Sequence, residues 1–184
     1  ATDEFNATIS RIFSYAAWAD KFDGAAHDAP YRGVTLALPE PIGIIGLVAP
    51  DNQPLLSAIS LIAPAIAMGN RVVYIPGERY QNIVLELVSV METSDIPGGV
   101  INIITGDKAE LSKHLAGHGE VESIWCWGNP EINKNIEAIS VENLKRTWCN
   151  ENNDRDWLDI KSGEGTEFLR KATQIKNIWT PYGD

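Results

Sequence analysis

Two cysteines are the first residues to consider for chemistry, because a cysteine thiolate can attack an electrophilic carbon. Cys126 and Cys149 each lie near the end of an apolar segment and beside a tryptophan, and the sequence holds no further cysteine. A cysteine in such a segment usually packs as a small hydrophobic side chain, and no histidine is placed to activate either thiol. We therefore expect neither cysteine to be a catalytic nucleophile, and two cysteines do not make a disulfide framework.

The turn Trp127-Gly128-Asn129-Pro130 is the second candidate. Gly128 permits a tight turn into a following helix, and the N-terminus of a helix can hold a phosphate. The bulk of Trp127 and Pro130 hinders close approach to this backbone. The turn therefore permits a phosphate at the helix N-terminus but hinders its close approach.

The elements that position these residues alternate between strands and helices, which predicts parallel crossovers. We expect an α/β fold: a Rossmann-like doubly wound parallel sheet with an N-terminal helix, a hairpin strand and a C-terminal oligomerisation strand. The N-terminal helix is expected to end at Asp23-Gly24, residues 25–32 to form a loop, and Pro64 to kink or divide its helix. The expected strands are 34–38 (broken by Pro39 and Pro41), 42–48, 71–75, 100–104, 121–125 and 143–149, and the expected helices are 5–18, 55–68, 80–92, 109–116, 131–139 and 164–171.

Three parts follow from this pattern. Residues 1–32 are the N-terminal helix and loop, residues 33–150 the Rossmann-like cofactor-type domain, and residues 151–184 a polar loop, a short helix and an oligomerisation tail. Within the tail, 174–181 is predicted to be extended and without an evident partner in this chain. Such an unpaired strand adds readily to a sheet of another subunit, so we expect a homo- or hetero-oligomer through 174–181.

The composition excludes several classes of protein. The hydrophobic fraction of 44% and charged fraction of 22% are ordinary for a globular protein, and a net charge of −10 argues against nucleic-acid binding. No apolar run approaches the roughly 20 residues that span a bilayer, no signal peptide is visible, and the low cysteine content favours the cytoplasm. The chain begins at Ala1, as a piece trimmed from a longer protein would. No metal site is expected, because the three histidines lack ligand neighbours at metal spacing, and we expect them on the surface: His27, His114 and His118.

Several segments, in order and at family spacing, resemble the aldehyde dehydrogenase superfamily. Residues 40–54 resemble the first core strand and loop of its cofactor domain. Residues 162–176 resemble the segment that closes the family's fold, yet only a short loop stands where the family has its catalytic domain. The nearest likeness, through 143–148 and 176–183, is to the degenerate second module of the two-module family-sixteen aldehyde dehydrogenases. The remaining matching segments are 11–24, 32–42, 63–70, 97–106 and 143–146.

This resemblance implies a broken catalytic set. The family uses a cysteine nucleophile, an asparagine that helps to hold the oxyanion, and a glutamate as general base. Asn52 matches the oxyanion position, although an asparagine between Pro50 and Pro54 also suits a loop. The general-base position is Asn150, whose amide cannot accept a proton at neutral pH.

The resemblance also implies a reduced cofactor site. The matching positions are Pro50, Asn52, Glu78 for the ribose, Gly106 near the adenine and Gly128 for the pyrophosphate.

Two replacements oppose cofactor binding. Ile75 stands where the family has a ribose-binding lysine, and Lys108 stands where a glycine is common and would crowd the adenine. The pyrophosphate turn also ends at Asn133 rather than at a glycine. Losing two charge-assisted contacts of about 1.5–3 kcal/mol each weakens binding by roughly two to four decades. We therefore expect NAD or NADP binding to be weak or absent in this chain.

Three functions remain open. The first is a non-catalytic module with a structural role for an active aldehyde dehydrogenase module, in cis or in trans. The second is part of an active NAD(P)-dependent aldehyde dehydrogenase whose cysteine lies outside this chain, and the third is a dinucleotide sensor without turnover. The tryptophans are equally open, because aromatic side chains fill cores and also interfaces: Trp125, Trp127, Trp148, Trp157 and Trp179.

Overall fold

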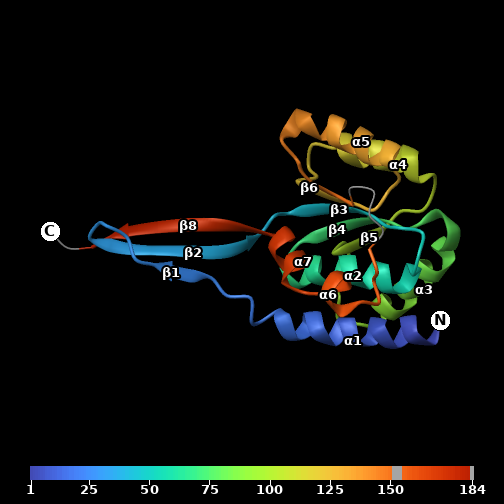
Figure 1. The fold of residues 1–184 in the computed structure, drawn as a ribbon, viewed down its shortest axis with the longest axis horizontal. Coiled ribbons are helices and arrows are strands. Elements are labelled where there is room, and N and C mark those ends of the chain that lie inside the picture. Colours follow the sequence, from blue (N-terminus) through green and yellow to red (C-terminus); the bar gives the residue numbers. More distant parts are fainter. Residues whose placement is uncertain (151–154, 183–184) are drawn as a thin grey trace.

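The computed structural model describes residues 1–150 and 155–182, and these residues form two separate sheets (Figure 1). The larger sheet is parallel, with strand order β5-β4-β3-β6-β7, and confirms the expected doubly wound α/β core. The chain builds outward from β3 through β4 to β5 and then returns to the other side of β3 for β6 and β7. These strands are β3 (Ile44–Val48), β4 (Arg71–Ile75), β5 (Ile101–Ile103), β6 (Ser123–Cys126) and β7 (Arg146–Cys149).

Helices cover both faces of this sheet (Figure 1). α4 and α5 lie together on one face, and α1, α2 and α3 lie on the other. α2 is apolar on nearly all sides because it lies between the sheet and α1. The bounds are α1 (Thr2–Trp18), α2 (Pro54–Ala67), α3 (Gln81–Glu92), α4 (Lys108–Gly117) and α5 (Pro130–Ile139), with short 3-10 helices η1 (Glu78–Tyr80) and η2 (Ser140–Asn143).

Two features of the helices bear on the sequence prediction. α1 covers the expected helical positions and ends at Trp18, ahead of the Asp23-Gly24 turn that was expected to end it. The Trp18 carbonyl accepts hydrogen bonds from the N–H groups of Lys21 and Phe22, and the bond to Lys21 spans three residues, as in a 3-10 turn. Pro64 does not divide α2, which runs unbroken from Pro54 to Ala67. Pro64 lies in the last turn of α2, where its missing N–H removes one hydrogen bond of the helix.

The smaller sheet is an arm that projects from the body (Figure 1). β2 (Gly33–Pro41) and β8 (Thr173–Pro181) pair antiparallel over all nine residues of each, and β1 (Ala25–His27) pairs with the opposite edge of β2. The prediction that 174–181 lacks a partner inside the chain is therefore wrong, since β2 is that partner. The stretch 25–32, expected as a loop, supplies β1.

The arm strand β2 also runs through the two prolines that were expected to break it. A strand tolerates proline where its edge is unpaired, and β1 pairs only with residues 35–37, so the edge of β2 beside Pro39 and Pro41 has no neighbour in β1. The arm is exposed on both faces and carries Val34 (43% exposed), Ile175 (58%) and Trp179 (69%).

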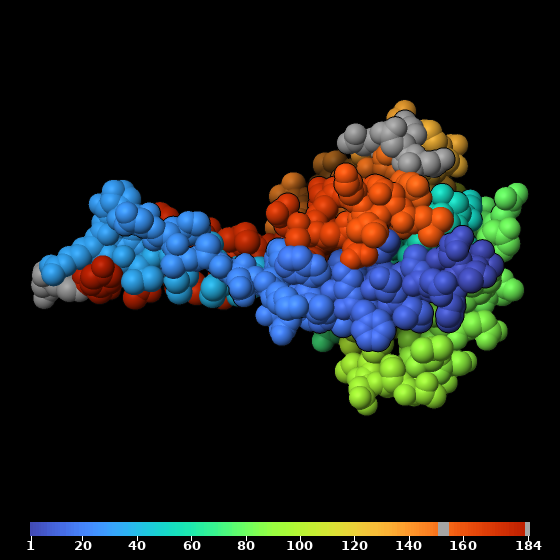
Figure 2. Space-filling model, turned by 60° about the horizontal axis from the view of Figure 1, so that its bottom comes forward, coloured from blue at the N-terminus to red at the C-terminus, as the bar shows by residue number. Residues whose placement is uncertain are grey.

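The segment from residue 155 to the start of β8 lies along α1 on the surface of the body (Figure 2). It contains α6 (Ile160–Gly163) and α7 (Thr166–Lys171). The buried guanidinium of Arg11, 1% exposed, joins α1 to this segment. It donates to the Glu164 carboxylate at 3.1 Å, to the Trp157 carbonyl at 3.0 Å, and to the Gly163 carbonyl and the Ser60 hydroxyl of α2. One arginine thus ties together residues that are about 150 positions apart in sequence.

Asn70 makes a second buried tie, at the base of the arm. Its side-chain oxygen accepts from the N–H groups of Ile42 (2.7 Å) and Gly43 (3.0 Å), between β2 and β3. Its amide nitrogen donates to the carbonyls of Ala65 (2.9 Å) and Ala172 (2.8 Å), the latter just before β8. Asn70 therefore connects the roots of both long arm strands to the end of α2.

The tryptophans divide between the two roles that the sequence left open. Trp125, Trp127 and Trp157 are buried, and Trp148 packs against them with Phe168 in contacts between ring edges and faces. Trp179 instead lies exposed on the arm, stacked on Tyr31 with ring centroids 5.9 Å apart. The first four fill the core beside α7, and Trp179 belongs to exposed arm surface.

Candidate functional site

A cleft of about 370 Å³ opens where the strands of the larger sheet end. Ligands in open α/β sheets bind at the carboxyl ends of the strands, at the point where the strand order reverses. That point lies here between β3 and β6, and the cleft is lined by the loops that follow them. The lining residues are Pro50, Asp51, Asn52, Glu78, Lys108, Trp127, Gly128, Asn129, Ile132, Asn150, Arg155 and Trp157.

The structure brings most of the sequence-predicted site residues together in this cleft. Pro50, Asn52, Glu78, Gly128 and Asn150 all line it, although they come from loops after four different strands. Gathering them required only the parallel sheet, because the carboxyl ends of its strands share one edge.

Gly106 is not among the residues that line the cleft. It lies in the turn before α4, at a φ of +155°, and its carbonyl accepts a hydrogen bond from the Gln81 side chain at 3.1 Å. Ile75 is likewise turned away from the cleft, because its side chain packs in the apolar cluster with Val48 and Leu115.

Asp51 is the residue of the cleft that sequence reasoning missed. Its carboxylate accepts from the Lys108 ammonium at 3.0 Å and from the Glu78 N–H at 2.7 Å. Burial acts to raise the pKa of Asp51, but the hydrogen bond and charge of Lys108, with the N–H groups of Glu78 and Arg79, outweigh it and hold that pKa below its ordinary value. Asp51 is therefore an anion that neutralises Lys108.

Lys108 is buried, with 5% of its surface exposed. The sequence predicts that this side chain crowds an adenine. In the structure the lysine side chain crosses the cleft to Asp51. The backbone N–H of Lys108 donates to the Glu78 carboxylate at 3.4 Å. The ribose candidate Glu78 and the loop after β3 are thus joined through Lys108. The cleft is spanned by charges of this chain itself.

The turn into α5 also satisfies its own hydrogen-bonding groups. Asn129 is the N-cap of α5, and its side-chain oxygen accepts from the Ile132 N–H at 2.9 Å. An N-cap occupies one of the N–H groups that a phosphate would otherwise use. The adjacent Trp127 ring packs edge-on against Trp148 and Trp157, at centroid distances of 5.0 Å and 5.3 Å. The candidate phosphate turn is therefore walled by indole rings and partly capped by Asn129.

Asn150, which the sequence predicts at the general-base position, forms a hydrogen bond with Asn133 of α5. The Asn133 amide donates to the Asn150 side-chain oxygen at 2.6 Å. An amide oxygen that accepts this bond has no basicity for proton abstraction. Asn52, the oxyanion candidate, lies exposed at the rim, and Gln53 beside it holds a left-handed backbone with φ 48° and ψ 58°. A non-glycine residue in that conformation stores strain, which is common at binding loops.

Arg155 also lines the cleft, and the sequence did not predict it there. Its guanidinium lies 5.0 Å from the Phe168 ring centroid and 5.3 Å from that of Trp148, and it hydrogen bonds to the Ser162 carbonyl and the Glu167 carboxylate. Cation–π contacts of this kind are worth about 0.5–2 kcal/mol each. The clustered tryptophans were the only available signal, and they gave no hint of the cation among them.

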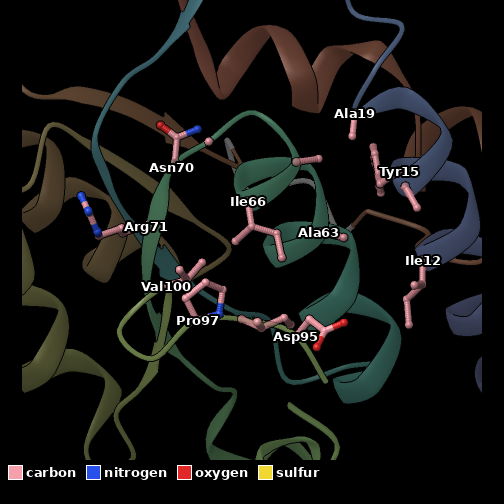
Figure 3. Close-up of a pocket in the computed structure, with 14 residues that line it drawn as sticks. Ile12, Tyr15, Ala19, Ala63, Ile66, Asn70, Arg71, Asp95, Pro97 and Val100 are labelled. Atoms are coloured by element: carbon pink, nitrogen blue, oxygen red, sulfur yellow. The ribbon is translucent and has the colours of Figure 1, made fainter. Parts of the chain in front are cut away.

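A larger cavity of about 550 Å³ lies at the opposite edge of the sheet, between α1, α2 and the loop before β5 (Figure 3). Its lining is mostly apolar and includes small residues on both helices, such as Ala16, Ala63 and Ala67. Asp95 and Arg71 are its charged residues. It holds none of the predicted site residues.

Residues 1–150 and 155–182 contain neither a candidate metal site nor a candidate membrane span. In that range no group of three or more histidine, cysteine, aspartate or glutamate residues could hold a metal ion. No helix there has the length and apolar character needed to cross a membrane. His27, His114 and His118 are all exposed, as predicted.

Taken chemically, the cleft offers a carboxylate for hydroxyl groups, an exposed amide and a short helix-terminal turn. Among the described residues that line it there is no cysteine, and the predicted general-base position holds the amide of Asn150.

The comparisons with known proteins agree on one family. The model of the aldehyde dehydrogenase family matches residues 1–151. Human retinaldehyde dehydrogenase 3 is 35% identical over 139 residues, which are 75% of this chain and 27% of the human protein. Betaine aldehyde dehydrogenase of Hordeum vulgare is 38% identical over 136 residues, which are 71% of this chain and 27% of that protein.

Solved structures give the same result. PnpE from Pseudomonas sp. WBC-3 matches with a TM-score of 0.76 at 27% identity, covering 79% of this chain and 30% of PnpE, and PnpE has also been solved in complex with nicotinamide adenine dinucleotide. Betaine aldehyde dehydrogenase of Staphylococcus aureus, in complex with NAD+, matches with a TM-score of 0.75 at 29% identity, covering 79% of this chain and 30% of that one. The chain thus spans less than a third of the length of these relatives.

Proposed function

The chain belongs to the aldehyde dehydrogenase family, and we propose that within it this chain is a catalytically degenerate module with a structural and assembly role. It serves an active aldehyde dehydrogenase module, either in the same longer polypeptide or as a separate subunit. The finer likeness that we propose is to the second module of the two-module family-sixteen enzymes.

The arm is the observation that carries the assembly role. β1 covers only residues 35–37 of β2, so most of the arm is a two-stranded ribbon, which is only marginally stable in water on its own. β2 and β8 nevertheless extend from the body (Figure 1) with apolar side chains on the surface, among them Ile175 and Trp179. The outer edge of β8 pairs with no strand among the described residues. An exposed edge of this length is a template for another chain, so burying the arm in a partner explains both its length and its apolar surface.

The cleft supports the catalytic part of the proposal. The Lys108–Asp51 pair spans it, Asn129 caps the turn into α5, and the Asn150 amide stands at the general-base position. Each feature removes a group or a space that the dehydrogenase reaction needs. A site that binds a cofactor weakly and cannot transfer a proton fits a module kept for its shape.

The test of assembly is the mass of the protein in solution. We expect the double variant Ile175→Lys/Trp179→Lys to lower the mass found by sedimentation equilibrium, because two ammonium groups cannot be buried in an interface without partners. The control Gln174→Lys/Thr180→Lys adds the same charges to the same strand at exposed polar positions. Equal masses for both variants and the parent chain, with unchanged circular dichroism, would argue against an arm-mediated oligomer.

A second function is supported by Glu78 and Gly128, two predicted cofactor-binding residues that line the cleft. The chain is then one part of an active NAD(P)-dependent aldehyde dehydrogenase, which converts an aldehyde to a carboxylate with a cysteine outside this chain. The intact mass in the source cell separates the two settings. A mass near 20.2 kDa supports a separate subunit that needs its partner in trans, and a several-fold larger mass supports one polypeptide that includes the catalytic cysteine.

The third function, a dinucleotide sensor, is tested by fluorescence. Trp127 and Trp157 line the cleft, so a bound nicotinamide dinucleotide would change their emission. A saturable change on titration with NADH supports the sensor. A linear, non-saturable response that a non-binding absorber reproduces excludes it and favours the structural module.

A further inference from the structure

Cys126 and Cys149 are the last residues of two neighbouring parallel strands. Cys126 ends β6, Cys149 ends β7, and the two residues are directly paired in the register of the sheet. Neighbouring strands lie about 4.7–4.9 Å apart, which falls inside the Cα separation of roughly 4.4–6.8 Å that disulfides show. The backbone therefore holds these two residues at the distance that a sulfur–sulfur bond requires.

The two side chains also share one face of the sheet. Cys126 belongs to the apolar cluster beneath α4 and α5, and Cys149 packs against that same cluster. The neighbouring Cys149 thiol, together with burial, raises the pKa of Cys126 above its ordinary value. Both side chains thus lie on one side of the sheet, and both thiols are reduced in this structure.

The pair lies directly under the turn that leads into α5. A Cβ atom placed on Gly128 would lie 3.1 Å from the Cys126 sulfur, so the turn packs directly on that thiol. Gly128 lines the cleft, so the thiol pair is adjacent to the cleft without opening into it. The proposed assembly role makes no use of this arrangement.

We propose that Cys126 and Cys149 are a site of reversible oxidation, at which a hydroperoxide converts the two thiols to an intramolecular disulfide. Cys149 is the entry point, because it is partly exposed while Cys126 is 0% exposed. The Cys149 sulfur attacks the O–O bond and becomes a sulfenic acid, and the other peroxide oxygen leaves as water or an alcohol. The Cys126 sulfur then displaces the sulfenic hydroxyl as water, so the peroxide is reduced by two electrons and both thiol protons end in the released products. A dithiol reverses the reaction by exchange.

The test is oxidation of the folded chain with hydrogen peroxide, followed by alkylation in denaturant and intact mass measurement. The expected product is a monomer that has lost two hydrogens and both alkylation sites, with both sites recovered after dithiothreitol. The chain has two cysteines, so each product is unambiguous. A disulfide-linked dimer, or a chain with sulfinic acid on Cys149 and an alkylated Cys126, would overturn the proposal.

A second measurement shows whether the fold, rather than the short sequence separation of the two cysteines, favours the disulfide. In glutathione redox buffers we expect the dithiol–disulfide equilibrium constant to favour the disulfide at least tenfold more in the native chain than in urea, because the sheet holds the sulfurs together. Tenfold corresponds to about 30 mV for this two-electron couple. An equal or smaller constant in the native chain would contradict the proposal. Neither readout requires a bound cofactor or an assembled partner, so this proposal and the assembly role stand or fall separately.

Discussion

Asn70 gives the sharpest test of how the arm is fixed to the body. Its side chain makes four hydrogen bonds at 2.7–3.0 Å, two accepted from β2–β3 backbone and two donated to the ends of α2 and α7, and it is 2% exposed. At about 1 kcal/mol net for each bond, Asn70→Ala should lower the free energy of unfolding by about 4 kcal/mol. The assay is urea denaturation followed by tryptophan fluorescence, since the indoles of the core report its loss.

The matched control for this variant is Asn143→Ala. Asn143 is exposed and donates to the carbonyls of Gly119 and Val121 over longer distances of 3.2 Å and 3.4 Å. Water replaces such bonds readily, so the expected loss is under about 1 kcal/mol. A loss for Asn70→Ala no larger than that of the control would refute the reasoning, because it would mean that the four groups find other partners at no cost.

Three further predictions concern buried charge, backbone strain and pH. Arg11→Met should lower the free energy of unfolding in urea by about 3–5 kcal/mol, because the Glu164 carboxylate loses its partner; a loss under about 1 kcal/mol would contradict this. Leu144 is 89% exposed and has a left-handed backbone with a φ of 55°, a conformation that asparagine adopts more readily than leucine. Leu144→Asn should therefore raise the free energy of unfolding in thermal denaturation by about 1 kcal/mol. The control Val141→Asn, at a nearby exposed position, should not raise it. Lys108→Ala should raise the pKa of Asp51 in an NMR titration. In the parent chain the pKa of Asp51 is lower in the folded than in the unfolded state, so ionised Asp51 stabilises the fold at pH values above its unfolded-state pKa, and this stabilisation is lost as the pH falls through the folded-state pKa. The free energy of unfolding of the variant should therefore fall less on acidification. An unchanged pKa of Asp51 in the variant would refute the Lys108–Asp51 ion pair.

Much of the core could be predicted from the sequence because its pattern is local. Apolar runs such as 42–48 and 71–75 alternate with amphipathic segments, and that alternation leaves few topologies for a parallel sheet. The gathering of Glu78, Gly128 and Asn150 at one edge followed from the same sheet, since all three come after strands. Family resemblance supplied their candidate roles, which remain predictions.

The errors have a common physical origin in long-range pairing. Nothing local in 174–181 says that 33–41 is its partner, because an extended segment shows its own alternation but not the strand beside it. The prolines of β2 suggested a break, whereas an edge without a neighbour tolerates them.

The cleft shows the same limit. Asp51 and Lys108 are 57 residues apart, and only the fold shows that the lysine crosses the cleft to the aspartate. Arg155 was invisible for the same reason, since its aromatic contacts come from four separate elements of the chain.

The central claim is that this chain keeps the family's scaffold without its chemistry. The most direct measurement is aldehyde-dependent NADH or NADPH formation by the purified chain, with acetaldehyde and benzaldehyde as substrates. We predict a rate equal to that of the aldehyde-free blank for each cofactor. A saturable rate that Cys149→Ser or Cys126→Ser abolishes would contradict the claim and make this chain a dehydrogenase in its own right.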